Sequence, residues 1–512
     1  MTSAVKIAGG RTVSRRAALT TVLAVLFLTF LDTTIVSVTL GDLETDISAG
    51  VIPLQWVINA YSLVFASLML IGGSLADRFG RKWVMLGGVV IFCAGSLMCA
   101  LASGVAMVIA GRAVMGLGAA ASEPGTLSVI RQLYPQRTER ARALGAWSAV
   151  SGLALALGPV IGGLLVGAGG WRAIFWFNLV LGVVLAVAVF VFVPDSSDPR
   201  AGRIDIAGFV LATAGFGCVI FAAISGEYQG YGTTGIIALF VIGALCLVAF
   251  VPVERRVRAP MLNLSYVREP IVGSALFAAF AVYFGVFAIF FLTALYLDIG
   301  LLYSGWKLAG MFAPMAAAIV LGGVAAGPWV ARAGSRQPLM IGCLLGAAGT
   351  VLGRFEIGHG SSLTFGVLAL ALALAGLGFG ITVVPLTSAV LSHVPARHSG
   401  MAASATNTAR QLGAVVGVAV LGAIVNAHLT TAVNDQFSGP TLAGARAAIL
   451  KILETGGNAG SFTLDDIPPA FVLAFLDGVK LALLVATVLI VLAGIAAAMV
   501  REPPVLDEED VS

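Results

Sequence analysis

Among the charged residues inside the long apolar stretches of this 512-residue sequence, three could bind a proton or a cation or tune its binding. Asp32 falls in the run 17–40, and both Arg112 and Glu123 fall in the run 105–128. A carboxylate in an apolar environment needs a partner, a cavity or a proton, and an arginine there cannot realistically lose its charge. The two acids could therefore bind a proton or a cation reversibly, and Arg112 could tune that binding.

Each of these residues also has a structural interpretation. Asp32 could be fixed in an ion pair, with Arg112 or with Arg410. Arg112 could be a clamp between helices, which does not exclude a role near the acid. Glu123 lies about 16 Å beyond Arg112 along a helix. It could be a second proton or cation site that faces an inward cavity, or a solvated acid near the inner interface.

A glycine-proline pair interrupts the apolar run 141–166, where Gly158-Pro159 is followed by Gly162-Gly163. A proline removes one helical hydrogen bond and kinks the helix. Adjacent glycines allow close contact between helices. The pattern predicts a hinge or a proton-tight seal, and ordinary packing of small residues is the alternative.

Polar residues also gather on one side of the run 400–426, at Asn407, Arg410 and Gln411. Such groups form interhelical hydrogen bonds more often than they bind a substrate, and both interpretations stay open. The sequence lacks the phosphate-loop pattern G-x-x-x-x-G-K-[ST] and any cluster of His, Cys and Glu with catalytic spacing. We therefore expect no enzymatic activity, no metal and no cofactor.

The elements that position these residues follow from composition. The sequence is 59% hydrophobic and 11% charged, which excludes a soluble globular protein and a disordered chain. A bilayer core requires roughly 20 apolar residues per helix. Continuous apolar runs, without the alternation of a membrane barrel, predict an all-α integral membrane protein. Fourteen runs meet this length, at 17–40, 54–75, 83–103, 105–128, 141–166, 171–193, 204–225, 233–252, 270–296, 307–330, 336–355, 362–388, 400–426 and 477–500.

Basic residues set the expected orientation. With a cytoplasmic N-terminus, 21 of the 29 lysines and arginines fall on the cytoplasmic side and six on the outer side. We therefore expect both termini in the cytoplasm, an outer loop at 427–476 and a cytoplasmic tail at 501–512. The outer loop could hold a short amphipathic helix or be a simple spacer. The basic N-terminus leads into a run too long for a cleaved signal.

A short repeat suggests internal duplication. The segment Gly73–Lys82 joins runs 2 and 3, and the similar segment Gly327–Arg336 joins runs 10 and 11. We predict an N-terminal six-helix half at 1–200, two inserted helices at 201–258 and a C-terminal six-helix half at 259–500. Duplicated bundles of this kind commonly bind substrate at the midplane and rock to give alternating access.

The first copy of the repeat contains residues suited to a tight membrane-surface turn. Gly80 permits the turn. Asp77 could accept from the first amides of the following helix or pair with a neighbouring arginine. Arg78, Arg81 and Lys82 could hold the turn at the anionic inner leaflet. A role in topology alone would explain the basic residues, but would explain Asp77 and the glycine spacing less well.

Taken in order, several motifs resemble those of the fourteen-span drug/proton antiporter branch of the major facilitator superfamily. Departures include Met115 in the fourth-span motif, Ala154 in the fifth-span motif and Glu123, where the branch more often has an apolar residue. The matching segments are Leu31–Leu40, Gly73–Lys82, Arg112–Ala120, Gly158–Gly163 and Asn407–Gly413.

The resemblance implies a proton-coupled antiporter that exports hydrophobic small molecules, which could be cationic, by alternating access. It implies a role for Arg112 in proton coupling. The expected partners are a small-molecule substrate, protons and the lipid bilayer, with no nucleic acid, and the expected functional unit is a monomer. The alternatives are an exporter of one dedicated metabolite, such as an antibiotic or a lipid precursor, and a membrane sensor or scaffold that does not transport. Abundant Ala and Gly, with Arg preferred to Lys, suggests a bacterial plasma membrane.

Overall fold

The computed structural model describes residues 4–6, 12–47, 51–195, 205–257, 260, 262–297, 306–357, 362–395, 398–436 and 469–500. It begins with a short antiparallel hairpin of β1 (Ala4–Lys6) and β2 (Thr12–Ser14), in which Ala4 pairs with Ser14. The expectation of an all-α protein holds for the rest of the described chain. The helices are α1 (Arg15–Ile35), the 3-10 helix η1 (Val36–Thr39), α2 (Leu40–Ile47), α3 (Val51–Phe79), α4 (Arg81–Ala100), α5 (Val105–Leu133), α6 (Arg137–Gly169), α7 (Arg172–Phe192), α8 (Ile206–Gln229), α9 (Thr234–Arg256), α10 (Leu264–Val267), α11 (Pro270–Leu295), α12 (Trp306–Ala333), α13 (Arg336–Glu356), α14 (Ser362–His393), α15 (Ser399–Gln436) and α17 (Pro469–Ala497).

The predicted membrane spans are confirmed. Within the described residues, 13 helices are long and apolar enough to cross a membrane, and the bent helix α6 brings the number to 14. Large apolar side chains are exposed on the outside of the bundle, for example Val184 at 58% and Val248 at 69%. Such a surface requires a lipid environment.

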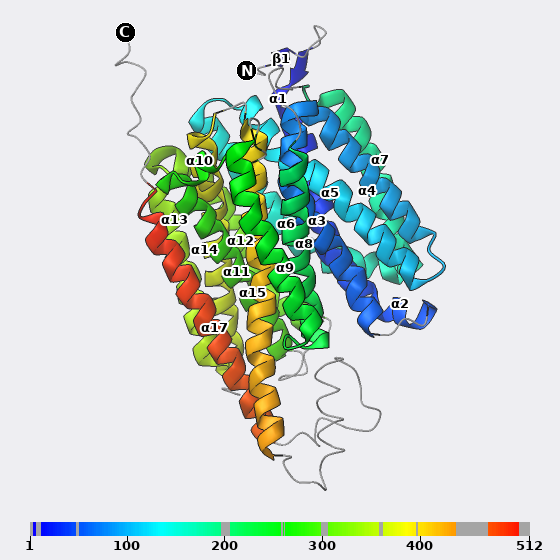
Figure 1. Cartoon of the computed structure of the whole chain (residues 1–512), viewed down its shortest axis with the longest axis vertical. Helices are drawn as coiled ribbons and strands as arrows, with labels where there is room; N and C mark the ends of the chain where they lie inside the picture. The colour runs from blue at the N-terminus through cyan, green and yellow to red at the C-terminus, as the bar shows by residue number, and fades with distance from the viewer. Residues whose placement is uncertain are drawn as a thin grey trace.

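The spanning helices pack in two groups with a pair between them. We call α1–α7 the N-terminal helices and α11–α17 the C-terminal helices. Helices α8 and α9 pack on each other, and α8 also contacts α3 and α15. The two groups meet mainly where α6 packs on α12 and α3 packs on α15. Figure 1 shows this arrangement, with α8 and α9 in front of the junction.

The two groups are held closely at one end of the bundle. Helix α1 begins and α17 ends at this end, which we call the terminal end; α3 and α15 draw apart towards the other end (Figure 1). Near the terminal end, a Cβ atom on Gly73 of α3 would lie 2.2 Å from the carbonyl oxygen of Gly400 in α15. A glycine at position 73 therefore allows the two helices to touch.

Both copies of the repeated turn contain a glycine with a positive φ. The expected loop around Gly80 is a break of one residue, because α3 extends to Phe79 and α4 begins at Arg81. Gly80 has a φ of 97°, and Gly334, which ends α12, has a φ of 76°. Residues other than glycine rarely adopt such backbone angles. This shared requirement supports the internal repeat.

The first predicted span is shorter in the structure, and two predicted segments lie largely outside the described residues. The first span ends at Ile35 rather than residue 40, because η1 and α2 follow it; the β-branched residues of Val36–Thr39 are weak helix formers. Most of the expected outer loop, at 437–468, and the tail at 501–512 lie outside the described residues.

Candidate functional site

Asp32 lies at the centre of a fully buried polar site. Its side chain is 0% exposed. Arg112 Nη1 donates to one carboxylate oxygen, and Asn178 Nδ2 donates to the other at 2.7 Å. The structural interpretation named Arg112 or Arg410 as the partner, and the partner is Arg112. The charge of Asp32 is therefore balanced inside the bundle.

Arg112 is itself held from three directions. Its Nε donates to the carbonyl of Val57 at 2.9 Å, and its guanidinium carbon lies 4.5 Å from the centroid of the Tyr61 ring. The Tyr61 hydroxyl donates to the carbonyl of Thr29 at 3.1 Å. We call Asp32, Arg112, Asn178 and Tyr61 the acid site. It is assembled entirely from the N-terminal helices α1, α3, α5 and α7.

The acid site lies nearer the end opposite the termini. Helix α5 starts at that end with Val105, and Arg112 follows about 10 Å along the helix axis. Asn178 comes at a similar depth after Arg172, where α7 starts. Helices α5 and α7 both start at this end, so Arg112 and Asn178 lie at a similar depth although they are far apart in the sequence.

Glu123 belongs to a second polar chain at mid-depth. Its side chain is 1% exposed, so the interpretation of a solvated acid near the interface is wrong. Asn407 Nδ2 donates to Glu123 at 2.7 Å, and Arg410 Nη1 donates to the Asn407 side-chain oxygen at 2.9 Å. We call these three residues the bridge, because they link α5 of the N-terminal helices to α15 of the C-terminal helices.

Arg410 has further partners on both sides. It donates to the Val383 carbonyl at 3.3 Å and to the Thr387 hydroxyl. Its guanidinium carbon lies 5.3 Å from the Trp147 ring centroid and 5.6 Å from that of Tyr283. These contacts agree with the interhelical role predicted for Asn407 and Arg410. Among the described residues, Gln411 is half-buried and stands outside this hydrogen-bonded set.

Asp77 forms a third polar contact, at the terminal end. Its two oxygens accept from the backbone amides of Gly400 and Met401, each at 3.0 Å. Arg81 donates to Asp77 at 3.0 Å and to the Ser399 hydroxyl at 2.7 Å. The expected pairing with a neighbouring arginine is present. The amides belong to α15 instead of the following helix, because α15 begins beside the end of α3.

The other basic residues of this end have separate contacts. Arg78 lies in the last turn of α3, with its guanidinium carbon 5.3 Å from the Phe79 ring centroid. Arg131, near the end of α5, donates to the carbonyl of Val394 at 2.6 Å. The second contact is another link between the N-terminal and the C-terminal helices.

The glycine-proline motif produces the expected kink. Helix α6 bends by 44° between Thr138–Leu155 and Val160–Gly169. A Cβ atom on Gly158 would lie 1.9 Å from the Thr34 hydroxyl, so α1 packs directly on this glycine. Gly162 is buried. The close contact expected at Gly163 is absent: this residue is exposed, and a Cβ there would meet no described atom within 4 Å.

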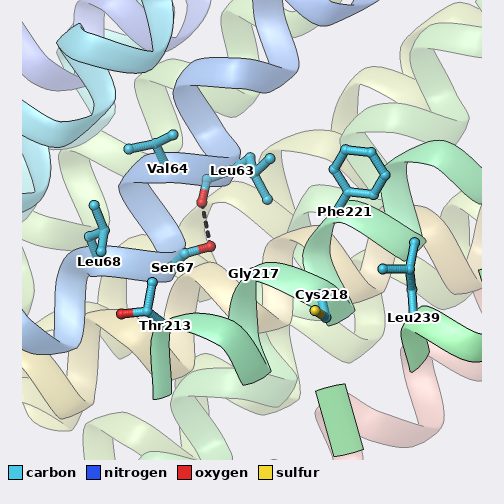
Figure 2. A pocket seen from close by; sticks show the side chains of 9 residues that line it. All are labelled: Leu63, Val64, Ser67, Leu68, Thr213, Gly217, Cys218, Phe221 and Leu239. Carbon is cyan, nitrogen blue, oxygen red and sulfur yellow. Dashed lines mark hydrogen bonds between the residues drawn. The ribbon is translucent and has the colours of Figure 1, made fainter. Parts of the chain in front are cut away.

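A separate groove of about 420 Å³ lies between α3, α8 and α9 (Figure 2). The Ser67 hydroxyl in its wall donates to the carbonyl of Leu63 at 2.6 Å. None of the described residues that line it is charged. The lining residues are Leu63, Val64, Ser67, Leu68, Thr213, Gly217, Cys218, Phe221 and Leu239. The groove therefore suits apolar material, and its described lining residues include none of the acid site.

Sequence reasoning missed three groups at Asp32 and Arg112, namely Asn178, Tyr61 and the carbonyl of Val57. Asn178 stands alone among apolar residues and at the same depth as Arg112, and that signal could have identified it. The Val57 carbonyl is a backbone group, so no residue type in the sequence indicates its contact with Arg112. Within the described residues, no group of three or more His, Cys, Asp or Glu side chains is placed to hold a metal ion.

Comparison with known proteins finds relatives named for drug resistance and transport. The Multidrug resistance protein Stp of Mycobacterium tuberculosis H37Rv is 32% identical over 90% of this chain and 87% of its own length. The Probable actinorhodin transporter of Streptomyces coelicolor is 33% identical over 83% of this chain and 75% of its own length. The Methylenomycin A resistance protein of Bacillus subtilis is 32% identical over 80% of this chain and 88% of its own length.

A solved structure shares the fold. The human organic anion transporter MFSD10 (TETRAN) superposes with a TM-score of 0.64 at 15% identity, over 94% of this chain and 99% of that one. The family model for the Major Facilitator Superfamily matches residues 22–418. This match includes the acid site, the bridge and both copies of the repeated turn. The chain is a multi-pass membrane transporter that belongs to the Major Facilitator Superfamily.

Proposed function

We propose that this protein is a proton-coupled antiporter that exports hydrophobic small molecules, cations among them, across a bacterial plasma membrane. The observation that carries the proposal is the acid site, in which a fully buried carboxylate is balanced by one arginine and one amide. Buried acids in membrane transporters mark ion and proton pathways. The names of the relatives, which refer to drug resistance and export, support efflux as the direction.

The proton acts by changing the charge balance of this site. When Asp32 takes up a proton, its attraction to Arg112 falls and the guanidinium charge is left without a counterion. A positively charged substrate is then repelled and released. Loss of the proton on the other side restores the pair and lets new substrate bind. One charge that crosses about 100 mV provides about 2.3 kcal/mol, equivalent to a concentration ratio of roughly 50.

The terminal end is the cytoplasmic end in this proposal. The basic residues Arg15, Arg81, Lys82 and Arg131 gather in helix segments near that end, as the positive-inside rule requires. Both termini are then cytoplasmic. In this proposal the Asp77 and Arg131 contacts join the two groups of helices at the cytoplasmic end.

Alternating access follows from two groups of helices that move as halves. The N-terminal helices carry the acid site, and the bridge and the Asp77 contacts join them to the C-terminal helices. To open inwards, these links have to break while the contacts at the other end form. The boundaries 1–200, 201–258 and 259–500, and action as a monomer, belong to this proposal.

Export of one dedicated compound is the second candidate. It is favoured by relatives named for single compounds, such as the Tetracenomycin C resistance and export protein of Streptomyces glaucescens, 28% identical over 92% of this chain. The geometry of the acid site is compatible with either substrate range, so a panel of toxic compounds separates the two candidates.

The test is efflux of ethidium, a planar cation, from energised cells. Wild type and Asp32→Asn are compared at equal expression, each with and without a protonophore. The proposal predicts efflux by wild type that stops with the protonophore, and little efflux by the variant. Efflux by wild type that survives the protonophore contradicts proton coupling. A well-expressed wild type that exports no compound of the panel contradicts broad drug efflux.

A further inference from the structure

The kink in α6 leaves one backbone carbonyl without its helical donor. In a regular helix, the N–H of residue 159 would donate to the carbonyl of Leu155. Residue 159 is a proline and has no N–H. A carbonyl buried in a membrane protein needs another donor, because water is absent there.

Thr34 of α1 supplies that donor. Its hydroxyl donates to the Leu155 carbonyl at 3.1 Å, and the carbonyl of Leu31 in its own helix is farther away, at 3.4 Å. Gly158 makes the approach possible, because a Cβ there would lie 1.9 Å from the Thr34 hydroxyl. The threonine, the glycine and the proline therefore form one device across two helices, which we call the pin.

The pin lies next to the acid site. Thr34 follows Asp32 by two residues, which is a rotation of about 200° around the helix. Asp32 accordingly faces α5 and α7, through Arg112 and Asn178, while Thr34 faces α6. Any shift of this last turn of α1 that follows a change at Asp32 reaches α6 through Thr34.

Helix α6 carries such a shift to the other group of helices. Its straight part packs on α12, where a Cβ on Gly145 would lie 3.0 Å from the carbonyl of Gly323. A Cβ on Gly152 would lie 2.4 Å from Ile319 of α12. The kink thus stands between the acid site and the contact surface between the two groups.

We propose that Thr34 is a positioning residue that couples the acid site to the kink of α6, through its hydrogen bond to the carbonyl that Pro159 leaves without a donor. The inference rests on the proposed function for its effect on transport. The hydrogen bond itself is tested separately, on purified full-length protein and without a proton gradient.

The direct test is hydrogen–deuterium exchange of peptides that cover residues 150–165, in wild type and five variants. Thr34→Val removes the donor at nearly constant volume, and Thr34→Ser keeps it. Pro159→Ala returns an N–H to the Leu155 carbonyl. The double variant Thr34→Val/Pro159→Ala therefore has an internal donor again. Thr21→Val is the matched control, because the Thr21 hydroxyl donates to Ala17 within α1.

We expect Thr34→Val to raise exchange in this segment by roughly tenfold, the size expected when one buried acceptor loses its donor. Exchange in Thr34→Ser and in Thr21→Val should stay within about twofold of wild type. Exchange in the double variant should stay within about twofold of Pro159→Ala. An equal rise in Thr34→Val and Thr21→Val would overturn the pin, and so would a rise in the double variant that matches the single one.

Transport then tests the coupling. Thr34→Val should lower the maximal rate of ethidium efflux by roughly five- to tenfold with little change in the substrate concentration at half-maximal rate, and Thr34→Ser should restore it. A normal rate in Thr34→Val, with raised exchange, contradicts the coupling role. If wild type exports nothing, the proposed function fails, while the exchange result still decides whether the pin exists.

Discussion

At the scale of single residues, the molecule balances charge inside an apolar bundle by surrounding Asp32, Arg112 and Arg410 with several donors or acceptors. Asp32 receives hydrogen bonds from Arg112 and Asn178, and Arg112 also binds a backbone carbonyl. Burial of a pair costs desolvation energy, and loss of one partner costs more because the other charge is left alone. The acid site is therefore sensitive to any change in charge, as the proposed proton coupling requires.

A double-mutant cycle tests this balance. Arg112→Gln leaves Asp32 buried without its counterion and should lower the free energy of unfolding by about 3–5 kcal/mol. Asp32→Asn/Arg112→Gln removes both charges and should recover most of that loss. The measurement is unfolding of the purified protein in detergent. Additive effects of the two substitutions would show that the charges do not interact.

A surface acid gives a prediction about pH. Asp46 in α2 accepts from Trp171 Nε1 at 2.9 Å and from Arg172 Nη1 at 2.6 Å. These two hydrogen bonds, the Trp171 bond first, lower the pKa of Asp46 below its ordinary value of 3.8. The ionised acid thus stabilises the fold above that value, and the stabilisation is lost as the pH falls through the lower pKa of the folded state.

Asp46→Asn should therefore melt at a lower temperature than wild type at about pH 7, and the difference should shrink as the pH falls below about 3.9. Melting temperatures of both proteins across this range provide the measurement. A difference that stays constant down to the lowest pH at which both proteins fold would show that ionisation of Asp46 contributes nothing.

At the scale of elements, helix ends and breaks are fixed by a few residues with special backbone requirements. The turns at Gly80 and Gly334 both require positive φ, and they lie at matching places in the repeat. The bend of α6 follows from Pro159. These positions determine where the chain reverses direction or a helix bends. They therefore also determine which side chains lie at the same depth in the bundle.

Substitution of the turn glycines tests this requirement. Gly80→Ala and Gly334→Ala should each lower the free energy of unfolding by about 1–2 kcal/mol, because alanine is strained at positive φ. Gly87→Ala is the control, since Gly87 lies within α4 and a Cβ there meets no described atom within 4 Å. If the control loses as much stability as the turn variants, the backbone angle is not the cause.

The sequence predicts these elements well because membrane helices are long and continuously apolar, so the limits of most of the 14 runs fall within about five residues of the helix limits. The exceptions are the run 400–426, since α15 extends to Gln436, and the run 477–500, since α17 begins at Pro469. It predicts irregular parts poorly. The hairpin β1–β2 has no apolar pattern, and the end of α1 at Ile35 depends on a local run of β-branched residues within an otherwise apolar stretch.

The candidate site shows the same division. The charged residues Asp32, Arg112 and Glu123 could be identified because they stand out in apolar runs of the sequence. Their partners depend on how helices are arranged in space. The contact of Asp77 with the amides of Gly400 and Met401 joins residues more than 300 positions apart, and no pattern in the sequence indicates it.

At the scale of the whole molecule, the two groups of helices are joined by polar links from mid-depth to the terminal end. The bridge lies at mid-depth, and the Asp77 contacts lie at the end itself. Each link uses hydrogen bonds between groups that can separate without unfolding either group. This arrangement suits a molecule that changes between two states.

Glu123 provides the test at this scale. Glu123→Leu removes the acceptor for Asn407 and should favour separation of α3 from α15, whereas Glu123→Gln keeps an acceptor. Ser404→Cys reports the separation, because Ser404 is 0% exposed and faces Gly73. We expect thiol labelling at position 404 to be several-fold faster in Glu123→Leu than in Glu123→Gln.

Labelling of the native cysteines is measured in the same two Glu123 variants without Ser404→Cys, and this background is subtracted. Equal labelling rates in Glu123→Leu and Glu123→Gln would mean that the bridge does not hold the two groups together in this state.

The most direct test of the central claim is proton movement driven by substrate in proteoliposomes. Purified protein is reconstituted with a pH-sensitive dye inside the vesicles, and ethidium is added outside without any imposed gradient. The account predicts a pH change inside the vesicles with wild type and none with Asp32→Asn, although both proteins fold. Ethidium uptake by wild type without any pH change would contradict proton coupling through Asp32.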